Sequence, residues 1–196
     1  MSKKEQWSKV VRIISTPPLL AVALLFLLAM QHLYVFSSWV DFAVSVICLG
    51  VFPLLAYPTA RFFPIINQKG REGERELAFV FCLLGYTFLM LYGICFKWNP
   101  QLLLISETYF FSGWILALFN AVFHVRASGH SCGTTGPILL AGYLLGWQWA
   151  TPFTLLFLLA AWASITLKRH TRTEFFMGSI CCIGGFFIAW VLIHII

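Results

Sequence analysis

The sequence predicts an all-α, polytopic transmembrane helical bundle with six to seven spans. Hydrophobic residues make up 60% of the 196 residues and charged residues only 10%, and the mean hydropathy is +0.87. Apolar runs about as long as a bilayer-crossing helix recur along the chain, with short polar loops between them. The length is that of one domain. We therefore divide the chain into a basic N-terminal interfacial segment, 1–16, and a single transmembrane domain, 17–196.

Residues 1–16 favour a basic interfacial helix. Cations precede the first apolar run, and Trp7, Val10 and Ile14 fall roughly on one side of a helix. The arrangement is similar to the start of a signal peptide, but no small-residue cleavage site follows it and further spans do. We therefore expect an uncleaved segment.

Seven apolar runs follow, separated by turn residues. Pro17-Pro18 fits the first turn of a helix, and Lys97-Trp98-Asn99-Pro100 is typical of a sharp turn. The predicted spans cover approximately 17–36, 39–57, 77–96, 102–125, 135–145, 151–167 and 175–196. The fifth is short, and spans five and six could form one broken unit, which gives six.

The cations predict the orientation in the membrane. Spans two, four and six return the chain to the side on which it begins, so three polar loops share that side with the N-terminus. Every Lys and Arg except Lys97 falls there, an excess that is typical of the cytoplasmic side. We expect a multi-pass protein of the cell inner membrane with these loops in the cytoplasm. Because the basic residues stand in short loops rather than along a polar surface, we expect no nucleic-acid partner.

Two of the polar loops carry the candidate chemistry. The first is Arg126-Ala127-Ser128-Gly129-His130, and the second runs from Lys168 through His170 to Glu174. A cation, a small turn with free N–H groups and a histidine are the groups that a bound phosphoryl anion needs. A second histidine supplies a nucleophile or a proton donor. Glu174 lies one helical turn after His170, where its carboxylate can hold the other imidazole nitrogen or simply favour the start of a helix.

The cysteines and the acids limit the alternatives. Five of the six cysteines lie within apolar spans, where they act as small buried hydrophobes rather than as a disulfide framework. Cys132, near the polar loop, is a candidate thiol. A metal site built from His124, His130, His170 and Glu174 is conceivable. The few acids and the absence of aspartate on that side argue against a two-metal phosphatase, so we expect no metal and no cofactor.

These motifs resemble the type 2 phosphatidic acid phosphatase superfamily, which comprises integral-membrane lipid phosphate phosphatases. Ser128-Gly129-His130 is similar to the second motif, with Ala127 in place of its proline, and His170 is similar to the third-motif histidine. Lys69 and Arg75 are similar to the first-motif cations. The resemblance covers roughly residues 60–180.

The resemblance implies a metal-free mechanism. In it, His170 attacks phosphorus to form a phosphohistidine, and His130 protonates the departing lipid alkoxide. It further implies that Ser128, the Gly129 N–H and the first-motif cations hold the phosphate oxygens. The substrate would be a phospholipid or isoprenoid phosphate embedded in the membrane.

The sequence also departs from this pattern. The first motif lacks its proline and its Lys-to-Arg spacing differs by one, the third-motif arginine is Ser164, and the third-motif aspartate is Glu174. If residues 151–168 are helical, Lys168 lies one turn beyond Ser164, and its amine would reach back over the space that Ser164 leaves. Alternatively, Lys168 only marks the cytoplasmic end of span six. Three functions follow in order of preference: a working phosphatase, a degenerate relative that binds lipid phosphate without turnover, and a non-enzymatic membrane scaffold.

Overall fold

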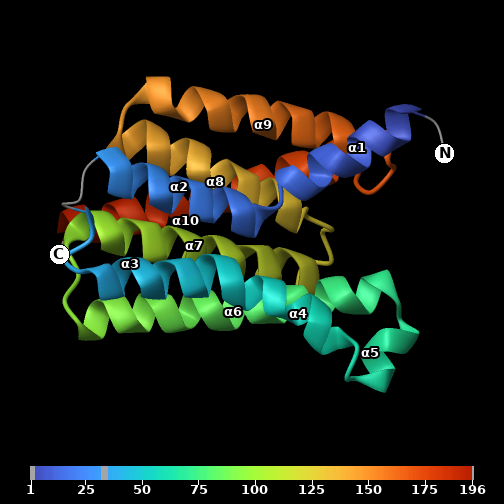
Figure 1. Cartoon of the computed structure of the whole chain (residues 1–196), viewed down its shortest axis with the longest axis horizontal. Coiled ribbons are helices and arrows are strands. Elements are labelled where there is room, and N and C mark those ends of the chain that lie inside the picture. Colours follow the sequence, from blue (N-terminus) through green and yellow to red (C-terminus); the bar gives the residue numbers. More distant parts are fainter. Residues whose placement is uncertain (1–2, 32–34, 196) are drawn as a thin grey trace.

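The computed structural model describes residues 3–31 and 35–195, and its regular elements are all helices (Figure 1). They are α1 (Lys3–Ile14), α2 (Pro17–Gln31), α3 (Trp39–Val46), the π-helical turn η2 (Ile47–Val51), α4 (Phe52–Ala60), α5 (Pro64–Gln68), α6 (Arg71–Cys95), α7 (Pro100–Ala121), α8 (Gly129–Leu144), α9 (Trp147–Thr166) and α10 (Arg172–Ile195). The predicted all-α class is confirmed. The expected end of the first span falls partly on residues 32–34, outside the described residues.

Five stretches within the described residues are long and apolar enough to cross a membrane, and a sixth is added if α1 and α2, bent by 49° at their junction, count as one broken span. The five are α3–η2–α4 as one helix, α6, α7, α9 and α10. Seven full spans are therefore not found. Helix α8 has 16 residues and spans only about 24 Å, less than the hydrocarbon core of about 30 Å. The chain is a multi-pass membrane protein.

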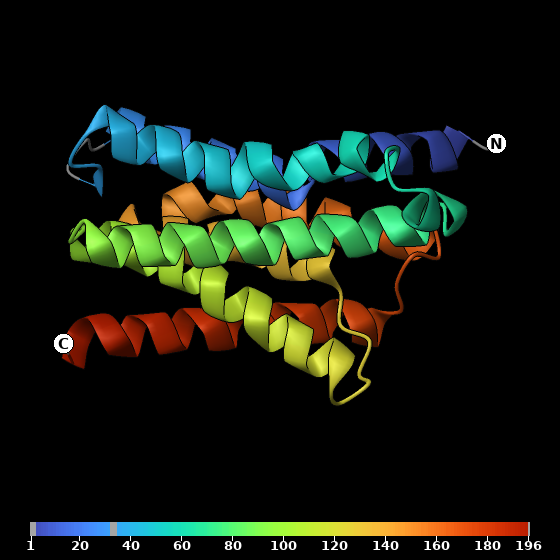
Figure 2. The same ribbon diagram turned by 90° about the horizontal axis from the view of Figure 1, so that it is seen from below.

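The helices run along one common axis, and their connections collect at its two ends. Figure 1 shows the N-terminus, α5 and the connections α7–α8 and α9–α10 at one end, with the C-terminus at the other. Seen from below, α10 lies on the side away from α3 and α4, and α7 crosses obliquely between α6 and α10 (Figure 2). The polar loops predicted to share a side therefore do so.

Glycines allow α10 to approach its neighbours closely. A Cβ on Gly178 would lie 2.2 Å from the carbonyl oxygen of Ser128, and one on Gly185 would lie 2.4 Å from the backbone nitrogen of Ser112. Such distances are too short for any side chain, because the opposing atoms belong to backbone. Gly178 thus lets α10 touch the start of α8, where His130 lies.

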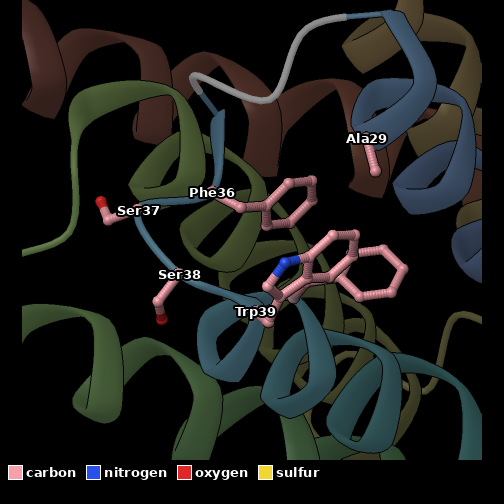
Figure 3. Close-up of a pocket in the computed structure, with 6 residues that line it drawn as sticks. Ala29, Phe36, Ser37, Ser38 and Trp39 are labelled. Carbon is pink, nitrogen blue, oxygen red and sulfur yellow. The ribbon is translucent and has the colours of Figure 1, made fainter.

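Polar contacts close the end of the bundle that carries the C-terminus. The Trp98 indole N–H donates to Asp41 Oδ1 at 2.7 Å, and Ser38 caps α3. A small hollow of about 160 Å³ lies beside these contacts, lined mainly by Ala29, Phe36, Trp39 and Phe42 (Figure 3). Its aromatic rings pack edge to face. The hydrogen bond from Trp98 lets Asp41, the one aspartate of the chain, join α3 to the turn after α6.

Candidate active site

A cavity of about 960 Å³ opens at the end of the bundle that carries the N-terminus. Both histidines of the polar loops, His130 and His170, line it. The cations that line it are Lys9, Arg12, Arg71, Arg75, Arg126 and Arg169, against the carboxylates of Glu72 and Glu76. This excess of positive charge in a partly enclosed space favours an anionic ligand.

His130 lies in the first turn of α8 rather than in a loop. The Ser128 hydroxyl accepts from the Ser131 N–H at 3.2 Å and caps the helix. The prediction that this helix begins near residue 135 was wrong, because Ser128 provides an earlier start and Pro137 is accommodated inside the helix. The N-terminal turn of α8 consequently faces the cavity through Gly129 and His130, where free N–H groups can bind an anion.

Glu174 fixes the orientation of His170. Its Oε2 lies 3.0 Å from His170 Nδ1, and His170 is only 7% exposed. The same carboxylate accepts from the Thr171 N–H, while the Thr171 hydroxyl accepts from the Glu174 N–H, which is a capping box at the start of α10. Glu174 therefore both holds the His170 ring and stabilises the start of α10, which are the two roles expected for it. With Nδ1 engaged, Nε2 is the His170 nitrogen left for a ligand.

The two polar loops are joined through their backbones. The Ser128 N–H donates to the Glu174 carbonyl at 2.9 Å. Asn120, at the end of α7, exchanges hydrogen bonds with the backbone of Ala127 at 2.8 and 3.3 Å. Arg126 Nε lies 3.9 Å from Glu174 Oε1. Asn120 was not predicted, and only its position at the end of an apolar run could have suggested it.

The N-terminal helix reaches the site, which the sequence analysis missed. Arg12 Nη1 donates to the Ser164 hydroxyl at 2.9 Å, and Ser15 Oγ lies 3.2 Å from His130 Nε2. Ser15 and Ser164 are fully buried. The available signal was that Arg12 and Ser15 lie three residues apart, and so share a helix face, away from the apolar side chains of the same segment.

The environment lowers the pKa of both histidines. Burial is the main cause in each case. For His130 the charges of Arg12 and His170 add to it, and the pKa falls to about 3. For His170, burial and the nearby Arg75 and Arg12 charges lower the pKa, and the hydrogen bond that Glu174 accepts from Nδ1 opposes them. Both shifts favour the neutral form of the imidazole.

The structure brings together most of the predicted site residues: His130, His170, Glu174, Gly129, Arg75 and Arg126. Three other predicted residues, Lys69, Ser128 and Lys168, do not line the cavity. Lys69 is exposed and forms an ion pair with Glu76 at 2.8 Å. Ser128 directs its hydroxyl to the helix cap and does not line the cavity.

Lys168 does not cover Ser164 as predicted. Helix α9 ends at Thr166, and Lys168 has a φ of 51°, so the helical geometry assumed for it does not exist. The side chain is exposed and does not line the cavity. Arg12 makes the contact to Ser164 instead.

His124, the further histidine of the first loop, is exposed and lies outside the cavity lining. Among the residues that the structure describes, no group of three His, Cys, Asp or Glu side chains is placed to hold a metal ion. Comparison with protein-family models, with curated proteins and with solved structures finds no match to this chain.

Proposed function

We propose that this chain is a lipid phosphate phosphatase that works through a phosphohistidine intermediate, as its motifs imply. The observation that carries the proposal is the state of His170. It is buried, held through Nδ1 by Glu174, and lines a cationic cavity together with His130. A nucleophile oriented by a third group, beside a second proton-transfer group, is the arrangement that covalent catalysis requires.

In the first step, His170 Nε2 attacks phosphorus and forms a P–N bond while the P–O bond to the lipid breaks. The departing alkoxide takes a proton from His130. Glu174 stabilises the positive charge that develops on the His170 ring. Arg75, Arg126 and the N–H groups at the start of α8 stabilise the charge on the phosphoryl oxygens.

In the second step, water attacks the phosphohistidine and the P–N bond breaks. His130, now neutral, accepts the proton of the attacking water. Inorganic phosphate leaves and both histidines return to their starting states. The cycle consumes one lipid phosphate and one water and needs no oxidant or reductant.

The proton on His130 arrives with the ligand. Burial and the charges of Arg12 and His170 lower the pKa of His130 to about 3, which favours a ring without the proton that the leaving group needs. A phosphoryl group brings close to two negative charges, which offset the repulsion from Arg12 and stabilise the protonated ring. Binding of the anion therefore raises the His130 pKa and favours protonation of the ring.

The cavity lining supports a lipid substrate. Beyond the cations it includes apolar side chains, among them Pro17, Pro53, Leu54 and Phe79. Leu54 belongs to a candidate span and is 37% exposed, so one wall of the cavity lies beside the lipid-facing surface. The bias of Lys and Arg toward this end of the bundle favours a cytoplasmic site.

The test is phosphate release by the purified full chain in detergent, with phosphatidate, phosphatidylglycerol phosphate and undecaprenyl pyrophosphate as substrates. We expect release that persists in EDTA and is inhibited by vanadate, which imitates the pentacoordinate phosphorus. Uncatalysed hydrolysis of phosphate monoesters is so slow that real turnover stands far above background. Activity lost in EDTA and restored by divalent metal would exclude the histidine mechanism.

A second function, binding of lipid phosphate without turnover, has specific support. Lys69 is paired with Glu76 and the Ser128 hydroxyl caps α8, so two expected phosphate ligands are engaged elsewhere. Under this alternative, the same lipids bind but release no phosphate.

A further inference from the structure

Helix α1 turns a narrow polar strip, Ser8 and Arg12, toward the protein, while most of its other polar and apolar side chains are exposed. Trp7, Ile13 and Ile14 are 54–66% exposed, whereas Ser8 and Ser15 are fully buried. Arg12 follows Ser8 by one helical turn, so it shares the inward face. Helix α1 packs along α9, which carries Ser164. An interfacial helix that served only as an anchor would direct all of its cations toward water and lipid headgroups, whereas Arg12 lies on the inward face.

Arg12 is placed to bind an anion in the cavity. Its guanidinium is half-buried and lines the cavity, and Nη1 donates to the neutral hydroxyl of Ser164. Among the described residues no carboxylate lies within ion-pair distance of it, and the nearby cations Arg169, Arg75 and Arg71 repel it. A guanidinium has five N–H donors, so most of them remain for a ligand. Buried charges are normally paired, so an anionic ligand in the cavity would complete the contacts of Arg12.

Arg12 is also close to the reacting groups. Its charge acts on both His130 and His170, and Ser15, on the next turn, contacts His130 Nε2. Helix α1 and the turn that follows it thus place a cation, Arg12, and a hydroxyl, that of Ser15, beside the two histidines. The Ser164 hydroxyl holds Nη1 of the guanidinium, and because Arg12 lines the cavity, its other N–H groups are available to a phosphoryl group bound there.

We infer that Arg12 binds the phosphoryl group, which makes α1 part of the active site. The inference rests on the proposed function, since it assigns a residue to the same anion. Arg12, contributed from the opposite end of the sequence, supplies the positive charge that Ser164 cannot. The ligand class is a phosphate monoester or pyrophosphate dianion, held by a bidentate guanidinium contact.

The experiment measures binding rather than turnover. The full chain in detergent is titrated with inorganic phosphate and with dihexanoyl phosphatidate by calorimetry, and its melting temperature is recorded. We expect Arg12→Ala to weaken binding of both ligands about tenfold or more, because a charge-assisted hydrogen bond is lost. Arg12→Lys should give an intermediate loss, since lysine offers a point charge only. Lys3→Ala is the matched control: it removes a cation from an exposed position of the same helix and should bind as the wild type does.

A second variant keeps the inference testable if Arg12→Ala is unstable. Ser164→Ala keeps the charge but removes the hydroxyl that holds the guanidinium, and should weaken phosphate binding by a smaller factor. Ser164→Arg combined with Arg12→Ala should restore part of the affinity. Wild-type affinity in a folded Arg12→Ala or Arg12→Lys protein would overturn the inference. If the wild type releases no phosphate but binds the ligands in a way that depends on Arg12, the phosphatase proposal is refuted and the inference about Arg12 stands.

Discussion

Replacing Glu174 by glutamine tests the central contact of the site. Glu174 Oε2 lies 3.0 Å from His170 Nδ1, and its side chain is 19% exposed. Glutamine keeps the size and serves equally in the capping box with Thr171, so the start of α10 is retained. What is removed is the negative charge that, in the proposed mechanism, would stabilise the attacking imidazole of His170.

A hydrogen bond to a charged partner contributes about 1.5–3 kcal/mol, so we expect kcat/KM to fall roughly 10- to 150-fold. The pH profile should change as well. Glu174 raises the His170 pKa against burial, the largest cause, which lowers it. Without the carboxylate the pKa falls further. Since the proposed mechanism needs a neutral His170 ring, kcat/KM should rise with pH through this pKa, and the acid limb of the profile should move to lower pH in Glu174→Gln.

The assay is phosphate release against pH for the wild type, Glu174→Gln and Glu174→Asp, each checked for its melting temperature. Glu174→Asp keeps the charge, so its acid limb should stay nearer to that of the wild type even if its shorter side chain lowers the rate. General damage to the fold would lower the rate without moving the limb. An unchanged rate, or a limb that moves to higher pH in Glu174→Gln, would refute the role given to Glu174.

Two further predictions concern packing and orientation. Gly178→Ala should lower the melting temperature and the activity together, because its Cβ would lie 2.2 Å from the Ser128 carbonyl oxygen. Gly184→Ala should be tolerated, because the nearest atom to its Cβ is a side-chain carbon at 3.6 Å. Equal melting temperatures of the two variants would contradict this packing. In a cysteine-depleted chain, an impermeant thiol reagent added to intact cells should label Lys97→Cys but not Gln68→Cys, since the two positions lie at opposite ends of the bundle and the cationic end should be cytoplasmic. The reverse pattern would place the cavity on the outer face.

Hydropathy alone was enough to predict most of the fold. A long apolar stretch without charges has few alternatives to a membrane helix, so the ends of α6 at Cys95 and of α9 at Thr166 were predicted within one residue, whereas α6 begins six residues before the predicted start at 77. The shared side of His130 and His170 followed from counting passes. The ends of helices were less predictable: Ser128 was expected to bind a ligand, yet it caps α8. A serine before a helix can serve either purpose, and the choice depends on which N–H groups lie near it.

What the sequence determined was therefore the composition of the site near the loops: two histidines, a carboxylate one turn after the second, and a surplus of cations on one side of the membrane. Only the tertiary structure decided which cations enter the cavity. Lys168 is two residues from His170 but lies outside, because α9 ends at Thr166 and the backbone turns at Lys168 with positive φ. Arg12 is 152 residues from Ser164 and yet contacts it. No local pattern encodes that contact, since it depends on how α1 packs against α9.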